Sequence, residues 1–137
     1  MTGQTNKTNK TFKDKPLLRA AKLCAQIADE KKATDILVLN VRETFRIADY
    51  FVICTCQSSP QTRAIADEIE KRLKQEGYSH LGTEGRAEAT WILLDYGSVV
   101  VHVFLSETRD YYQMETLWGD APSIDWSEET RQAAKNK

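Results

Sequence analysis

Cysteine and histidine are scarce in this chain of 137 residues, which contains three cysteines and two histidines. A structural zinc site draws its ligands mainly from these two residue types, and a redox dithiol usually has the spacing C-x-x-C. The chain offers only the C-x-C sequence of residues 54–56, with no second cysteine pair. The sequence therefore predicts no metal centre, no redox site and no cofactor.

Cys24, Cys54 and Cys56 are an odd number, so they cannot all pair in disulfides within the chain. We expect Cys54 and Cys56 to point to opposite faces of a strand and not to bond to each other. All three are interpreted as small buried side chains in a reducing compartment. The first residues contain no apolar run of the kind found in a secretory leader, and no run elsewhere approaches the roughly 18 apolar residues of a membrane span. We therefore expect a cytoplasmic protein without membrane contact.

A concentrated basic surface is missing as well. The formal net charge is −1, and residues 17–121 carry more acidic than basic side chains. Proteins that bind nucleic acid through its phosphates usually show a basic patch. The sequence therefore predicts little or no direct contact with nucleic acid.

Apolar residues are concentrated between residues 16 and 121, which predicts a single folded domain over this range. Residues 1–15 and 122–137 contain too few apolar groups to offset the entropy of ordering. We therefore expect a disordered polar N-terminal tail and a C-terminal tail. Trp126 is the exception in the second tail and could dock onto the domain.

Hydrophobic periodicity predicts an α/β domain with a mixed β-sheet of about five strands and helices packed on it. The first helix is expected to begin near Pro16 and to end near Lys32. A second helix is expected to begin at Ser58, capped by that hydroxyl in a capping box with Gln61, and to end at Gly77. The last helix is expected over residues 108–118, and the strands over residues 36–39, 49–55, 79–83, 91–94 and 99–104.

Residues 90–105 predict a β-hairpin, because two apolar runs flank the turn sequence Asp-Tyr-Gly-Ser. With a two-residue loop at 96–97, Trp91 would pair with His102 and Leu93 with Val100. One face of the hairpin is then wholly aliphatic and belongs to the core. The other face mixes aromatic, aliphatic and polar side chains, from Trp91, Leu93, Asp95, Ser98, Val100, His102 and Phe104.

This mixed face is interpreted as a protein-binding surface, because aromatic side chains supply contact area and polar groups fix orientation. Asp95 would pair with a basic group of the partner. The predicted binding residues are Trp91 as the central anchor, Leu93, Asp95, His102 and Phe104 on the same face, and Arg109 and Tyr112 at its rim.

The alternative is that the last helix covers this face with Tyr111, Tyr112 and Trp118. Trp91 would then be a core residue, and Arg109 would form a salt bridge at the start of the helix. Both arrangements can coexist, with the helix over one end of the face and a partner over the other.

Catalysis has little support in the sequence. His102 lies in the middle of a predicted strand, where a hydrogen-bonded structural or interface role is favoured over that of a general base. Asp49 and Asp95 fall on different strands, and neither has an identifiable acidic partner. Ser58 and Ser59 precede a helix, but no glycine-rich loop accompanies them. We expect a protein that is not an enzyme.

Several motifs together resemble the RsfS/Iojap family of ribosomal silencing factors. The first half of the family signature is similar to residues 49–53, 58–59 and 64–67. The second half is similar to Glu84-Gly85, Trp91, Leu94-Asp95, Gly97, residues 99–104, Arg109, Tyr112, Glu115 and Leu117-Trp118. The resemblance covers about residues 17–121. Cys56 departs from the Gly or Ala that is usual in the family, and Ser98 departs from the usual Asp.

The resemblance implies an α/β fold distantly similar to nucleotidyltransferases, without the Gly-Ser and paired-Asp signature of the active enzymes. It implies binding to the large ribosomal subunit through the ribosomal protein numbered fourteen, at the face that meets the small subunit. A domain bound there would block subunit association and repress translation when nutrients are scarce. The alternatives are a large-subunit assembly factor at the same site and a nucleotidyltransferase-type enzyme. A free chain could also form a homodimer through its aromatic surface.

Overall fold

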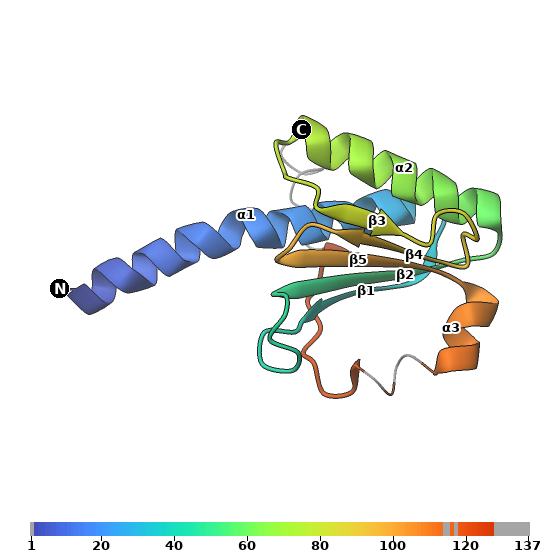
Figure 1. The fold of residues 1–137 in the computed structure, drawn as a ribbon. Helices are drawn as coiled ribbons and strands as arrows, with labels where there is room; N and C mark the ends of the chain where they lie inside the picture. Colours follow the sequence, from blue (N-terminus) through green and yellow to red (C-terminus); the bar gives the residue numbers. More distant parts are fainter. Residues whose placement is uncertain (1, 114–115, 117, 128–137) are drawn as a thin grey trace.

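The computed structural model describes residues 2–113, 116 and 118–127. Its elements follow the predicted order of helix, two strands, helix, three strands and helix, which confirms an α/β domain with a five-stranded mixed sheet (Figure 1). The elements are α1 (Thr2–Glu30), β1 (Thr34–Asn40), β2 (Tyr50–Cys56), α2 (Ser59–Gln75), β3 (Gly82–Glu84), β4 (Trp91–Asp95), β5 (Val99–Leu105) and α3 (Ser106–Tyr112).

The strands lie in the order β1-β2-β5-β4-β3. β2 and β5 are parallel, and the three other neighbouring pairs are antiparallel. All seven residues of β2 are buried. This burial explains why residues 50–56 form a nearly unbroken apolar run, as is typical of a strand covered on both faces.

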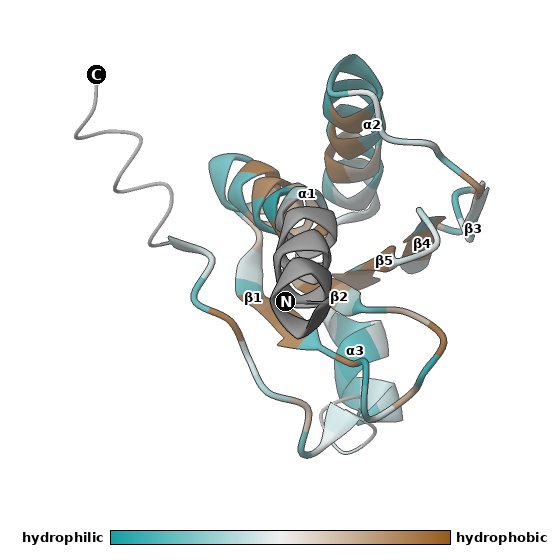
Figure 2. Ribbon diagram, turned by 90° about the vertical axis from the view of Figure 1, so that its left-hand side faces the viewer, coloured by the Kyte–Doolittle hydropathy of each residue, from teal (hydrophilic) through white to brown (hydrophobic). Residues whose placement is uncertain are grey.

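The two faces of the sheet are covered unequally. α1 and α2 lie together over one face, where their apolar side chains and those of β2, β4 and β5 form the first core cluster. α3 lies on the opposite side of the sheet (Figure 1). It is mostly hydrophilic, in contrast to the strands (Figure 2). The second face therefore has a smaller cover, made by α3, Trp118, Ala121 and residues 41–48.

Local capping explains where α2 begins and ends. The hydroxyl of Ser58 accepts a hydrogen bond from the backbone N–H of Gln61 at 3.3 Å, and the Gln61 side chain accepts one from the N–H of Gln57 at 2.8 Å. Each bond satisfies a donor that has no partner within the helix. At the other end, Gly77 has a φ of 87° and reverses the chain. Both predicted ends of this helix are confirmed.

Two other helix boundaries were predicted wrongly. Pro16 lies inside α1 instead of near its start, and the helix begins at Thr2. Proline favours the first turn of a helix, so the sequence alone places a start there. α3 ends at Tyr112 because Gln113 adopts a left-handed conformation with a φ of 48°. Trp118 is helical again after this break and packs against Phe104, with 6.1 Å between ring centroids.

The hairpin of β4 and β5 has a different register from the one predicted. Its loop is Gly97-Ser98, since the N–H of Tyr96 donates to the carbonyl of Val99 at 2.9 Å. Trp91 therefore pairs with Phe104, not with His102. A register shift of two residues leaves every side chain on the same face of a strand pair. The predicted pairs are wrong, but the predicted division into an aliphatic face and a mixed face is correct.

The expectation that Cys54 and Cys56 point to opposite faces is wrong as well. They are two residues apart in β2 and therefore share a face. Both belong to the first core cluster, and their thiols are hydrogen-bonded to each other. The Cys56 thiol raises the pKa of the Cys54 thiol, which keeps its proton. All three cysteines are buried and unbonded, as small apolar side chains would be.

The first residues of the expected C-terminal tail are packed along the outer edge of β1. The N–H of Asn40 donates to the carbonyl of Pro122, and the N–H of Ile124 donates to the carbonyl of Val38, both at 2.8 Å. Trp126 docks on the first core cluster, and its indole N–H lies 3.4 Å from the carbonyl oxygen of Ile36. Residues 128–137 lie outside the described residues, and the division of the chain into a domain and two tails stays a prediction.

Candidate functional site

The mixed face of the hairpin lies on the side of the sheet opposite α1 and α2. We refer to it as the Trp91 face, which comprises Trp91, Leu93 and Asp95 of β4 and Val100, His102 and Phe104 of β5. Trp91, Leu93, Asp95 and Val100 are half-buried, while His102 and Phe104 are buried. The structure therefore brings the predicted hairpin residues together on one face, four of them half-buried and two of them buried.

Trp91 is held in one orientation by its neighbours. Its indole N–H donates to Nδ1 of His102 at 3.2 Å. Its ring centroid lies 4.9 Å from that of Phe104 and 6.1 Å from that of Tyr112. A large, half-buried aromatic side chain with a fixed rotamer loses little conformational entropy when a partner covers it. Trp91 thus has the properties of an interface anchor.

His102 provides the acceptor that orients Trp91. The side chain is 6% exposed, and this burial lowers the pKa of the imidazole to about 4. The ring is therefore neutral at neutral pH, and because Nδ1 accepts a hydrogen bond, the proton resides on Nε2. Nε2 is buried and has no hydrogen-bond partner among the described residues. A neutral imidazole enclosed by aromatic rings suits a positioning role.

Phe104 and Asp95 have local structural roles. Phe104 is fully buried beneath Trp91 and Trp118 and supports the indole from below. The carboxylate of Asp95 accepts a hydrogen bond from the N–H of Gly97 at 2.8 Å, which stabilises the hairpin turn. Leu93 lies between Trp91 and Asp95 on β4, paired with His102 of β5 on one side and with Glu84 of β3 on the other.

Arg109 does not lie at an exposed rim. Only 5% of its surface is exposed, and its guanidinium donates to the carbonyl of Asp35 at 2.8 Å and to the hydroxyl of Thr55 at 2.6 Å. It also lies over the ring of Trp118, 5.6 Å from the centroid. These contacts attach α3 and Trp118 to the ends of β1 and β2. Arg109 therefore determines where the cover of the Trp91 face sits.

Two tyrosines of α3 extend the exposed aromatic surface. Tyr112 is 54% exposed and adjoins Trp91, as predicted for a rim residue, and Tyr111 is 79% exposed. Tyr111 was missing from the predicted site. Adjacent residues on a helix are about 100° apart, so a short helix cannot bury both, and this signal could have identified it. The last helix and Trp118 cover only one end of the face. Binding of a partner at the other end stays a prediction.

Phe45 is a second residue that the sequence did not identify. It belongs to the segment of residues 41–48 and stacks on Phe51 of β2, with 5.3 Å between ring centroids. No periodicity marks it, because it lies in an irregular segment. It closes the side of the Trp91 face nearest β1.

Exposed carboxylates lie beside Leu93 and on α3, the helix that contributes Tyr112 to the edge of the Trp91 face. Glu84 is exposed at the sheet edge next to Leu93, and Glu107 and Asp110 are exposed on α3. Asp95 is half-buried on the face itself, while the nearby basic residue Arg109 is buried. An aromatic centre with an acidic rim is complementary to a partner surface that carries lysine or arginine.

The loop that precedes Trp91 is fixed firmly to α2. The Thr62 hydroxyl donates to the carbonyl of Ala89 at 2.8 Å, and the Arg63 guanidinium donates to the carbonyl of Ala87 at 2.7 Å. Arg86 forms ion pairs with Asp67 and Glu70 on the same helix. Gly85 has a φ of 84°, and a Cβ added there would lie 2.0 Å from the carbonyl oxygen of Trp91. The rigid loop therefore fixes the position of Trp91 along the sheet.

Within the described part of the chain, no three His, Cys, Asp or Glu side chains are grouped as the ligands of a metal ion would be. None of the described helices combines the length and apolarity that a crossing of the bilayer requires.

Comparison with known proteins identifies the family. A sequence model described as "Ribosomal silencing factor during starvation" matches residues 14–137. The "Ribosomal silencing factor RsfS" of Bacillus subtilis is 46% identical over 104 residues, which are 76% of this chain and 88% of that protein. The chloroplastic protein Iojap of Zea mays is 34% identical over 90% of this chain and 54% of its own length.

Solved structures agree with these sequence relationships. A crystal structure of a protein from Chromobacterium violaceum has a TM-score of 0.70 and 35% identity, over 73% of this chain and 83% of that one. A crystal structure from Bacillus halodurans has a TM-score of 0.68 and 37% identity, over 80% of this chain and 97% of that one. The chain belongs to the RsfS/Iojap family of ribosomal silencing factors, which are not enzymes.

Proposed function

We propose that this protein binds the large ribosomal subunit through the ribosomal protein numbered fourteen and thereby prevents the small subunit from joining. The names of its relatives support ribosome silencing, and the Trp91 face supports a docking role. The observation that carries the proposal is Trp91 itself, half-buried and fixed by His102 on a sheet face that the helices leave partly uncovered.

The mechanism requires no chemical step. A stable protein–protein interface buries about 1,200–2,000 Å² in total, which a domain of this size can provide. If the partner surface overlaps the surface that meets the small subunit, the two binding events exclude each other. Translation is then repressed in proportion to the fraction of large subunits that carry the domain, and this fraction increases with the affinity of the domain for the subunit. The acidic rim, which includes Glu84 and Glu107, would meet basic groups on the ribosomal protein.

The test compares Trp91→Ala with the matched control Trp126→Ala. Trp126 is also half-buried, but it docks on the opposite core cluster and has no contact with the Trp91 face. We expect Trp91→Ala to weaken binding to purified large subunits by at least about 30-fold, since truncation of an aromatic hot spot removes 2 kcal/mol or more. The control should bind like the wild type. Subunit joining, followed by light scattering, should recover in parallel with the loss of binding.

A folded Trp91→Ala variant that binds large subunits as tightly as the wild type would contradict this docking surface. Circular dichroism on both variants establishes that they are folded. If the two variants weaken binding equally, the effect is one of stability and the Trp91 face is not the anchor.

A second function, assistance in the assembly of large subunits, is favoured by one relative. A mouse protein that is 35% identical over 92 residues is named "Mitochondrial assembly of ribosomal large subunit protein 1". Sedimentation of cell extracts separates the two functions, because a silencing factor migrates with mature large subunits and an assembly factor with their precursors.

We further propose that the free chain can form a homodimer through the same face. The uncovered aromatic surface, which includes Tyr111 at 79% exposure, would be partly buried in such a pair. Light scattering after size exclusion should then give a mass that rises with concentration and that falls to the monomer value for Trp91→Ala.

A further inference from the structure

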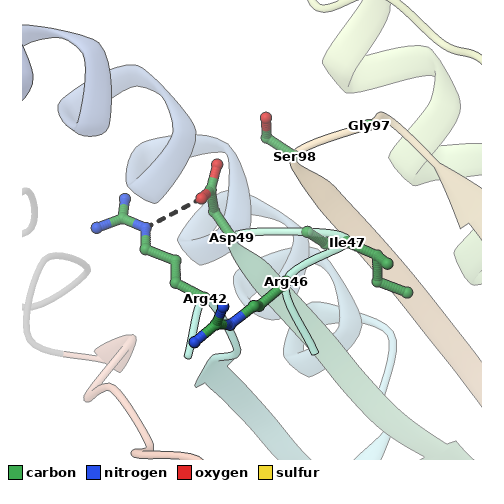
Figure 3. Close-up of a pocket in the computed structure, with 7 residues that line it drawn as sticks. Arg42, Arg46, Ile47, Asp49, Gly97 and Ser98 are labelled. Carbon is green, nitrogen blue, oxygen red and sulfur yellow. Dashed lines mark hydrogen bonds and ion pairs between the residues drawn. The ribbon is translucent and has the colours of Figure 1, made fainter. Parts of the chain in front are cut away.

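A hollow of about 450 Å³ lies at the end of the sheet where the hairpin turns (Figure 3). Trp91 lies at the other end of the hairpin, opposite Phe104. It is lined by one segment from before β2 and one from the hairpin loop, namely Arg42, Arg46, Ile47, Ala48, Asp49, Gly97 and Ser98. Backbone hydrogen bonds hold the two segments together. The N–H groups of Asp49 and Tyr50 both donate to the carbonyl of Ser98, at 2.8 and 3.0 Å. The hollow is therefore a fixed feature of the fold.

Arg42 is held in place at one side of the hollow. Its Nε donates to the carboxylate of Asp49 at 3.1 Å, and its Nη2 donates to the hydroxyl of Tyr50 at 3.2 Å. The guanidinium also lies over the Tyr50 ring, 5.1 Å from the centroid. These contacts hold the guanidinium in one orientation before any ligand arrives.

Arg46 adds a second positive charge without a matching acid. It is exposed, and among the described residues it has no hydrogen-bond or ion-pair partner. Its backbone is in the left-handed region, with a φ of 60°, which is strained for a side chain other than glycine or asparagine. Figure 3 shows the side chains of Arg42 and Arg46 extending to the same side, while Ile47 extends the other way. Ile47 is 77% exposed, an unusual position for a large aliphatic residue.

We propose that this hollow binds a phosphate group of ribosomal RNA when the domain is docked through the Trp91 face. The inference rests on the proposed function, because it makes the hollow a second contact of the same complex. The two contacts are separated by most of the length of β5, which corresponds to about 20 Å. Contacts so far apart would fix the orientation of the domain on the subunit.

A phosphate fits this hollow better than a protein carboxylate does. Its oxygens point in several directions, so two guanidinium groups can bind one phosphate, and arginine forks match this geometry. Two arginines against Asp49 leave a local excess of positive charge in a chain whose formal net charge is −1. The exposed Ile47, which extends to the other side of the hollow, would contact the apolar face of an adjoining sugar or base. Little nucleic-acid contact is expected elsewhere, so the contact with RNA is confined to this hollow.

The experiment measures the affinity for purified large subunits over a series of salt concentrations. Arg46→Asn removes the charge with a residue that tolerates the left-handed conformation, and Arg46→Lys retains the charge. Lys71→Asn is the matched control, because it removes an exposed positive charge from α2, away from the hollow. Each protein is also tested against the isolated ribosomal protein numbered fourteen, which contains no RNA.

We expect Arg46→Asn to lower the affinity for large subunits about tenfold at low salt and to reduce the salt slope by about 1. Its affinity for the isolated ribosomal protein should be unchanged. Arg46→Lys should retain most of the salt slope, and Lys71→Asn should behave like the wild type.

Unchanged subunit affinity and salt slope in Arg46→Asn, with Trp91→Ala still defective, would overturn the phosphate site and leave the proposed function intact. An equal loss of affinity for the isolated ribosomal protein would also overturn it, because the hollow would then bind a protein group. Failure of the wild type to bind large subunits at all would overturn both proposals.

Discussion

Burial of His102 creates a specific dependence of stability on pH. The pKa of the imidazole is lowered from 6.5 to about 4 in the folded protein, because burial penalises the charged form. Between these two values the unfolded chain binds a proton that the folded protein does not bind. The free energy of unfolding must therefore fall as the pH decreases from 6.5 to 4, and the difference between the pKa values corresponds to about 3 kcal/mol. Below pH 4 this contribution is fully lost.

Protonation of His102 also acts on the docking surface. A charged imidazole carries a proton on each nitrogen, so Nδ1 can no longer accept the hydrogen bond from the indole of Trp91. In the folded protein this protonation occurs only around pH 4, because burial lowers the pKa of the imidazole to that value. We therefore expect the affinity for the large subunit to fall as the pH decreases through about 4, below the range in which most of the stability is lost.

The assay compares the wild type with His102→Gln, whose amide retains a hydrogen-bond acceptor but does not titrate. Urea unfolding of both proteins from pH 4 to pH 8 gives two stability curves. All other side chains are the same in both proteins, so their contributions cancel when one stability curve is subtracted from the other. We expect the wild type to lose about 3 kcal/mol more than the variant between pH 6.5 and 4. A difference that stays constant across this range would refute the assignment of a buried neutral imidazole.

Two further substitutions test the supports of the Trp91 face. Gly85→Ala should lower the free energy of unfolding by about 2–5 kcal/mol, because the new Cβ would clash with the Trp91 carbonyl and the φ of residue 85 is positive. Chemical denaturation measures this loss. Gly82→Ala is the control, because a Cβ there meets nothing within 4 Å. Arg109→Met should lower stability by about 2–4 kcal/mol, because two buried acceptors lose their donor. Thermal unfolding checks this loss, and a stability equal to that of the wild type would show that α3 does not depend on Arg109.

The architecture was largely predictable because it depends on local patterns. Ser58 and Gly77 specify the ends of α2 through hydrogen bonds and backbone conformation within a few residues. The hairpin shows both the strength and the limit of such patterns. The alternation of side chains along each strand correctly assigned Trp91 and His102 to one face. A register shift of two residues does not change the face on which a side chain lies. The register itself depended on the Asp95 carboxylate at the turn, which places the loop at Gly97-Ser98.

The residues of the site were predictable from the sequence, but the burial of each side chain was not. The sequence assigned Leu93, Phe104 and Arg109 to the same site, but Phe104 and Arg109 are buried. Sequence periodicity tells which side of a strand a residue occupies, whereas burial depends on what lies above it. The cover comes from Trp118 and Phe45, whose placement depends on breaks and irregular segments that have no period.

The amino-acid sequence by itself determined the order of helices and strands, the composition of each strand face and the family. Only the tertiary structure decided that α1 and α2 share one face of the sheet and leave the other partly open. Only the tertiary structure also showed that Arg46 and Ser98 line one hollow. Residues so far apart in sequence meet only when β2 and β5 pair in parallel, and that pairing minimises the free energy of the whole sheet and not of any short segment.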